Sequence, residues 1–305
     1  MDSTGRGTLS MKPLSSRLAY SSNAYMRYPI EDAIRRIADL GYLGIELMFD
    51  TPHAWPEDVT PGQIDAIRSE LDRHRLTVAN VNAFMMNKIA DPRQPYWHPS
   101  WIEPDATYRQ IRIEHTRRSL TLARQLGARH ISTEPGGPLT DESQRERAMG
   151  LFVEMLKPVL DHAAREGVKL LIEPEPGLLI ETSEQFLDLR ARIDSPAMGL
   201  NFDIGHVFCV GESPARAVRT LAPHIDHVHV EDIAATRVHH HLVPGTGAID
   251  FAETFAALEE IGYEGWLTVE LYPFIDDPDG AGRQARSHLL GILETVQNRG
   301  GRAHE

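Results

Sequence analysis

The sequence predicts an α/β fold, a single (β/α)8 TIM barrel, and three observations support this prediction. From residue 17 onward, apolar segments of strand length alternate eight times with segments of helical periodicity. Four consecutive apolar segments end in an acidic or imidazole side chain, at intervals of about 25 to 40 residues that suit one strand plus one helix. The chain has 305 residues, which is enough for one barrel of about 250 residues with extensions.

The eight predicted strands are short runs rich in apolar and β-branched residues. They cover residues 17–22, 44–49, 76–84, 130–135, 169–173, 198–203, 224–230 and 266–272. A doubly wound open sheet would give the same alternation and stays an alternative at this point. The first strand is not followed by a G-x-G-x-x-G turn, which disfavours the dinucleotide-binding form of that sheet.

The helices between the strands carry their own signals. The first is predicted between Pro29 and Gly41, because apolar residues recur there at helical spacing and these two residue types favour a helix start and end. Three further helix starts have capping-box spacing or a close variant of it, with Pro61 at a first helical position. They are Thr60 with Gln63, Thr182 with Gln185, and Asp250 with Glu253.

We expect the barrel to fill residues 17–298 as one domain, with a flexible N-terminal segment, 1–16, and a flexible tail, 299–305, because both are polar. The N-terminal segment lacks the apolar stretch of about 7 to 15 residues of a signal peptide, and no run approaches the ~18 apolar residues of a membrane span. Cys209 is the only cysteine, so no intramolecular disulfide can form. These features predict a cytoplasmic protein without a membrane partner.

The charge balance argues against nucleic acid as a partner. The chain has 31 Lys and Arg residues against 44 Asp and Glu residues, a net charge of −13. Affinity for a phosphate backbone depends on clustered basic residues. A small molecule is therefore the expected ligand.

Four strand ends would bring metal-capable side chains together. Glu173, Asp203, His229 and Glu270 close four consecutive predicted strands, and TIM barrels keep their active sites at the carboxyl ends of the strands. One such carboxylate alone is more often a salt-bridge partner or a helix cap. Three buried together without a cation are opposed by repulsion and desolvation, so we predict one divalent metal ion. The oxygen-rich set favours Mn²⁺, with Mg²⁺, Co²⁺ or Zn²⁺ as alternatives.

Five segments resemble a known superfamily. IEPEPG, NFDIGH, HVHVED, HHLVPGTGAIDF and LTVELY are similar to the sugar phosphate isomerases and epimerases, the xylose isomerase-like TIM barrels. This superfamily includes ketose 3-epimerases, hydroxypyruvate isomerases, inosose dehydratases and the endonuclease IV group. The metal-site pattern resembles the ketose 3-epimerases most.

This resemblance implies roles for particular residues. The metal ligands of the ketose 3-epimerases fall on the four strand-end residues, and their acid/base pair falls on Glu173 and Glu270. The resemblance also implies that His206 contacts the substrate, and it makes Arg237 a displaced match to a substrate-binding arginine.

Three more residues are candidates for substrate contact. His241 precedes a Pro-Gly turn that resembles the loop after the seventh strand in that family. Its neighbours His239 and His240 either border the substrate or are solvated loop residues. Glu134 and Asn82 lie near the ends of the fourth and third predicted strands, where they could bind substrate hydroxyls or make loop or cap hydrogen bonds. For Glu175 we expect a salt bridge, and for His227 a packed position behind His229.

The function predicted from these features is a divalent-metal-dependent isomerase or epimerase of a small polyhydroxy ketone or aldehyde, a sugar or sugar-like compound. A divalent ion that bridges a carbonyl and the adjacent hydroxyl oxygen stabilises the ene-diolate formed when a neighbouring carbon loses its proton. Two carboxylates can remove that proton and return it. From the resemblance we also expect a homodimer or a homotetramer.

Departures from the family pattern keep other functions open. Leu179 stands where ketose 3-epimerases carry another glutamate, so the substrate is undetermined. The same residues suit a metal-dependent dehydratase of a cyclic keto-polyol, of the inosose or dehydroshikimate type. An endonuclease IV-like nuclease would need further histidines after the second to fourth strands, where His53 is the one candidate. A non-catalytic binding barrel is the last alternative.

Overall fold

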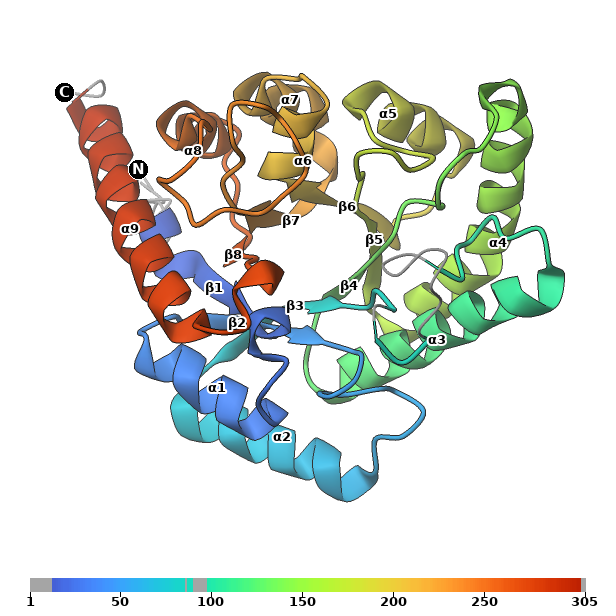
Figure 1. The fold of residues 1–305 in the computed structure, drawn as a ribbon, viewed down its shortest axis with the longest axis horizontal. Helices are drawn as coiled ribbons and strands as arrows, with labels where there is room; N and C mark the ends of the chain where they lie inside the picture. The colour runs from blue at the N-terminus through green and yellow to red at the C-terminus, as the bar shows by residue number, and fades with distance from the viewer. Residues whose placement is uncertain (1–12, 86, 90–97, 303–305) are drawn as a thin grey trace, which may run out of the picture.

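A closed eight-stranded parallel barrel forms the centre of the molecule. The computed structural model describes residues 13–85, 87–89 and 98–302. Within them the strands pair in chain order from β1 to β8, and helices surround the barrel (Figure 1). The pairing closes where Leu18 lies opposite Leu267 and Tyr20 opposite Val269. The predicted TIM barrel is confirmed, and the open-sheet alternative is wrong.

The strands lie where the sequence predicts them, with small differences at their ends. They are β1 Leu18–Ser21, β2 Gly44–Met48, β3 Thr77–Asn82, β4 His130–Thr133, β5 Lys169–Ile172, β6 Met198–Asp203, β7 Ile225–Val230 and β8 Leu267–Val269. Because all of them run in one direction, their carboxyl ends open on a single side of the barrel.

The helices connect the strands on the outside of the barrel. The α-helices are α1 Ile30–Asp39, α2 Pro61–His74, α3 Ala106–Gln125, α4 Arg145–Glu166, α5 Ser183–Arg192, α6 Ile204–Cys209, α7 Pro214–Leu221, α8 Phe251–Glu260 and α9 Pro278–Arg302. The 3₁₀ turns are η1 Leu14–Arg17, η2 Ser22–Tyr25, η3 Glu142–Gln144, η4 Ala222–His224 and η5 Tyr272–Phe274. Among the described residues, no helix combines the length and apolar character that crossing a membrane requires.

Local signals fix the helix starts as predicted. Thr60 and Thr182 each form a complete capping box with the glutamine three positions later. The Asp250 carboxylate accepts a hydrogen bond from the backbone N–H of Glu253 at the start of α8. In α1, the apolar residues at helical spacing are buried against the barrel. These caps satisfy N–H groups that a helix start leaves without partners.

The ordered structure extends past both predicted ends of the barrel domain. Leu14 is buried at the start of η1, inside the segment predicted to be flexible. At the other end, α9 continues to Arg302, into the predicted tail. Residues 1–12 and 303–305 lie outside the described residues, and their flexibility stays a prediction.

Replacement of Thr60 by alanine is expected to lower the free energy of unfolding by about 1 kcal/mol, because the N–H of Gln63 loses the hydroxyl that accepts its hydrogen bond. Chemical denaturation followed by circular dichroism measures this change. Thr60→Ser keeps the hydroxyl and is the matched control. Equal stability of the alanine and serine variants would contradict the assigned cap.

Candidate active site

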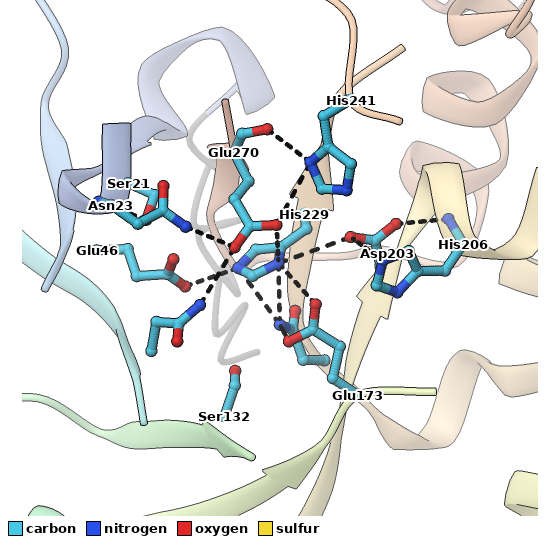
Figure 2. Close-up of polar contacts among 12 residues, drawn as sticks. Ser21, Asn23, Glu46, Ser132, Glu173, Asp203, His206, His229, His241 and Glu270 are labelled. Atoms are coloured by element: carbon cyan, nitrogen blue, oxygen red, sulfur yellow. Dashed lines mark hydrogen bonds and ion pairs between the residues drawn. The ribbon is translucent and has the colours of Figure 1, made fainter. Parts of the chain in front are cut away.

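The four predicted metal ligands converge on the carboxyl side of the barrel. Glu173 follows β5, Asp203 ends β6, His229 lies in β7 and Glu270 follows β8, and all four side chains point toward one another (Figure 2). All are buried, and one ligand atom from each lies within 4.8 Å of the others. The sequence prediction that these strand ends meet is therefore confirmed.

The Nδ1 atom of His229 lies at the centre of this group. It is 3.0 Å from Glu173 Oε1, 3.6 Å from Glu270 Oε2 and 3.7 Å from Asp203 Oδ2. Asp203 Oδ2 is buried and has no hydrogen-bond donor in the described part of the chain. Three carboxylates and one imidazole nitrogen form a donor set that suits a divalent cation.

Glu46, which the sequence analysis missed, lies on the opposite side of the His229 ring. It is fully buried inside β2, and its Oε2 atom lies 2.7 Å from His229 Nε2. A carboxylate only accepts hydrogen bonds, so Nε2 carries the proton that it donates to Glu46. This interaction directs Nδ1 toward the other three carboxylates. The signal in the sequence is a charged residue in the middle of an apolar strand, GIELM.

Asparagine side chains hold the carboxylates of the site in place. Asn201 donates a hydrogen bond to Glu173 Oε2 at 2.7 Å. Asn23 and Asn82 donate to Glu270 Oε1 at 2.8 and 3.2 Å. Asn82 was predicted to contact the substrate; in this structure it orients Glu270 and also lines the cavity. These neutral amides orient the carboxylates, but they do not neutralise the negative charge of the site.

The burial of several acidic groups together shifts their pKa values. Burial lowers the pKa of His229, but the surrounding carboxylates, Glu46 first among them, outweigh this effect and raise it well above its usual value. Burial also raises the pKa of Glu270 well above the usual range. For Asp203, burial acts in the same direction, but the nearby histidines, His206 first among them, lower its pKa overall. A cation would relieve the excess of negative charge.

A cavity of about 480 Å³ opens above the four residues. Glu173 and Glu270 lie in its wall, as do the predicted substrate-contact residues His206 and His241. Its other lining side chains include Asn82, Phe84, Glu175, His239, His240 and Tyr272. The cavity therefore combines carboxylates, imidazoles and two aromatic rings.

Two predicted substrate contacts lie elsewhere. The buried Glu134 carboxylate accepts a hydrogen bond from Trp101 N at 3.0 Å, so the loop hydrogen bond considered as its alternative is what the structure shows. Arg237 is exposed and donates a hydrogen bond to Phe208 O at 2.8 Å, with its guanidinium 4.4 Å from the ring centroid of Phe208. Neither side chain lines the cavity, because each is held by contacts with the residues around it.

Three secondary expectations can also be compared with the structure. Glu175 forms no ion pair with any described basic side chain; it is buried in the cavity wall, and burial raises its pKa well above the usual range. The expected salt bridge is therefore wrong. His227 is fully buried, with Nε2 3.8 Å from Glu46 Oε2, as expected for a packed position. The two ring nitrogens of His53 are engaged: Nδ1 lies 3.2 Å from Ser22 Oγ, and Nε2 lies 3.2 Å from Tyr25 O. His53 therefore does not offer a free metal ligand.

Comparison with known families places this geometry in context. The model of the xylose isomerase-like TIM barrel family matches residues 34–290. The chain belongs to this family. This confirms the resemblance derived from the five sequence segments.

Curated relatives of this family member cover most of its length. It is 24% identical over 276 residues to fructoselysine 3-epimerase from Escherichia coli O157:H7, covering 88% of this chain and 95% of the relative. It is 25% identical over 281 residues to inosose dehydratase from Clostridium beijerinckii, covering 85% of this chain and 88% of the relative.

Solved structures share the fold. A D-tagatose 3-epimerase-like protein superposes with a TM-score of 0.78 at 23% identity, covering 93% of this chain and 99% of that one. The IolI protein with a bound zinc atom superposes with a TM-score of 0.75 at 18% identity, covering 92% and 99% of the two chains.

Replacement of Gly205 by alanine is expected to lower the free energy of unfolding by about 1–3 kcal/mol through overpacking. A Cβ atom at this position in α6 would overlap with the buried Glu231 Oε1 and lie 3.0 Å from Ile233 Cγ1. Thermal or chemical denaturation measures the change.

The matched control is Gly62→Ala in α2, where a Cβ atom meets nothing within 4 Å. This change is expected to stabilise the protein by up to about 1 kcal/mol, because alanine favours a helix over glycine. A Gly205→Ala variant as stable as the Gly62→Ala variant would contradict the tight contact between α6 and Glu231.

Proposed function

We propose that this protein is a divalent-metal-dependent isomerase or epimerase of a small polyhydroxy ketone or aldehyde. The observation that carries the proposal is the position of Glu173 and Glu270, whose carboxylates lie beside His229 Nδ1 and also in the wall of the cavity. The names of the relatives support it, since fructoselysine 3-epimerase acts on a sugar-like compound.

The proposed metal ligands are Glu173, Asp203, His229 and Glu270. The buried Oδ2 atom of Asp203, which has no donor among the described residues, supports this assignment. A divalent ion held there would polarise a substrate carbonyl and make the neighbouring C–H bond more acidic. We propose Mn²⁺ because three of the four donors are carboxylates. Zn²⁺ is the alternative, since the related IolI structure contains zinc.

Proton transfer is assigned to the two carboxylates in the cavity wall. Glu173 is oriented by Asn201, and Glu270 is oriented by Asn23, so each carboxylate has a fixed position relative to a bound substrate. One carboxylate would remove the proton from the substrate carbon, and the other would return a proton to the resulting ene-diolate. Return to the opposite face of the same carbon gives an epimer, and return to the adjacent carbon gives an isomer.

The remaining cavity residues suit a polyhydroxy compound. The volume of about 480 Å³ lies within the range of about 300–1,000 Å³ typical of small-molecule sites. His206 and His241 offer imidazole nitrogens to substrate hydroxyls, and Tyr272 offers an aromatic ring and a hydroxyl. A location in the cytoplasm and assembly into a homodimer or homotetramer stay predictions.

Dehydration of a cyclic keto-polyol is the second candidate, and Glu175 favours it. This carboxyl lies in the cavity wall, and burial raises its pKa well above the usual range. A protonated carboxyl can donate its proton to a departing hydroxyl group. Inosose dehydratase from Clostridium beijerinckii, a relative over 85% of this chain, catalyses a dehydration by its name.

Replacement of Glu173 or Glu270 by glutamine is expected to reduce turnover about 100- to 10,000-fold, because glutamine cannot transfer a proton. The measurement is deuterium incorporation from solvent into a panel of ketoses and cyclic keto-polyols. Formation of an epimer, an isomer or an unsaturated ketone distinguishes the two candidate functions.

Glu184→Gln, on the exposed side of α5, is the control for this experiment and should keep full activity. The metal content of each variant is measured in parallel, so that a lost ion is not mistaken for a lost acid or base. Full turnover in both the Glu173→Gln and Glu270→Gln variants would contradict the proposed chemistry.

Replacement of Glu46 by glutamine is expected to weaken Mn²⁺ binding about 10- to 100-fold, the usual effect of removing a carboxylate that holds a ligating histidine. Glutamine can still accept the hydrogen bond from His229 Nε2, but it lacks the charge that makes Nδ1 a stronger donor. Isothermal titration calorimetry measures the affinity. Glu134→Gln, a buried glutamate outside the cavity, is the control, and an equal affinity in both variants would contradict the role of Glu46.

A further inference from the structure

Three polar side chains lie deeper in the barrel than the strand ends, on three neighbouring strands. Glu46 belongs to β2, Asn80 to β3 and His130 to β4. We call these three residues the inner polar network. Glu46 and Asn80 are fully buried, and His130, the first residue of β4, is partly buried. Figure 2 shows Glu46 on the side of the His229 ring that faces away from Asp203, and no member of the network lines the cavity.

Continuous hydrogen bonds join the inner polar network to His229. Asn80 Nδ2 donates to Glu46 Oε2 at 2.7 Å, and the same oxygen accepts the hydrogen bond from His229 Nε2. At the other end of the amide, Asn80 Oδ1 lies 2.8 Å from His130 Nδ1. Asn80 Nδ2 also donates to Ser132 Oγ at 2.7 Å. The network therefore runs from His130 through the amide and the carboxylate to the ring.

The acceptors determine the direction of these hydrogen bonds. A carboxylate only accepts, so the Asn80 amide turns its NH₂ group toward Glu46. The amide oxygen then faces His130, and because it also only accepts, Nδ1 of that ring carries a proton. An amide rotated by half a turn would place oxygen against oxygen at Glu46 and leave the His130 N–H without its acceptor. His130 thus holds the amide in the orientation that the carboxylate requires.

The Glu46 carboxylate depends on the donors to one of its oxygens. Its Oε1 atom is buried and has no hydrogen-bond donor in the described part of the chain, so the donors to Oε2 hold the group. The interior of a TIM barrel is usually filled by branched apolar side chains, and buried polar groups are costly unless they are paired. A polar network at this depth is explained if it serves the residue at its end, which is His229.

We propose that Asn80 and His130 are positioning residues of the metal site, which act through Glu46 on His229. This inference rests on the proposed function, because it requires that His229 Nδ1 binds the ion. Asn80 fixes the position of Glu46 Oε2, and this oxygen holds Nε2–H, so that the ring presents the lone pair of Nδ1 to the strand-end carboxylates. Groups behind a ligating histidine orient it and raise its basicity, so their loss weakens metal binding.

The test is the affinity of the full chain for Mn²⁺, measured by isothermal titration calorimetry. Asn80→Leu removes the amide at similar volume and is expected to weaken binding about 10-fold, the lower end of the effect typical of groups behind a metal ligand. His130→Leu is expected to weaken it about 3-fold, because it acts one hydrogen bond further from the ion. His130→Asn returns an N–H donor to the place of Nδ1 and should restore the wild-type affinity.

Thr133→Val is the matched control. Thr133 is buried in the same strand as His130, but its hydroxyl accepts a hydrogen bond from Trp101 Nε1 and takes no part in the inner polar network. This variant loses a buried hydrogen bond and should bind Mn²⁺ as the wild type does. Circular dichroism checks that each variant is folded. Asn80→Ser, whose hydroxyl is too short to reach Glu46, replaces Asn80→Leu if the latter does not fold.

The outcomes separate the inner polar network from the metal site itself. Wild-type affinity in both leucine variants would overturn the positioning roles and leave the metal site intact. The roles would also be overturned if His130→Asn bound Mn²⁺ as weakly as His130→Leu, or if Thr133→Val lost as much affinity as Asn80→Leu. A wild type that binds no Mn²⁺, or binds it no better than His229→Ala, would overturn the proposed metal site and this inference with it.

Discussion

The arrangement of the site depends on one constraint, the burial of four carboxylates around a single imidazole. Glu46, Glu173, Glu270 and Asp203 each have an oxygen within 2.7 to 3.7 Å of a ring nitrogen of His229. One imidazolium cannot neutralise four carboxylates, and their burial leaves little solvent to stabilise the remaining charge. The chain therefore adds amide donors for orientation and needs a further positive charge, which a divalent ion would supply.

The barrel makes this arrangement possible because parallel strands deliver their ends to one place. Glu46 lies within β2, deeper in the barrel than the other three acidic residues, which end or follow their strands. His229 thus lies between an inner carboxylate, Glu46, which holds its ring, and the outer carboxylates, of which Glu173 and Glu270 line the cavity. The inner hydrogen bond turns Nδ1 of His229 toward the outer pair, Glu173 and Glu270.

Much of this structure could be predicted from the sequence. The rest could not be predicted, and the reasons are physical. Strand and helix periodicity gave the barrel, and the register of the strand ends gave the four central ligands. Glu46 was missed because it lies within an apolar strand instead of at its end, so no spacing rule points to it. Arg237 and Glu134 do not line the cavity, and the sequence could not show this because local contacts, such as that of Arg237 with Phe208, leave no periodic signal. The same limit applied to His239, one of three consecutive histidines.

The most direct measurement is the anomalous diffraction of crystals soaked with Mn²⁺. Our account predicts a manganese peak within bonding distance of His229 Nδ1 and of oxygens from Glu173, Asp203 and Glu270, with Glu46 still bound to Nε2. A peak bound through Nε2, or no peak among these four side chains in crystals that have taken up manganese elsewhere, would contradict it.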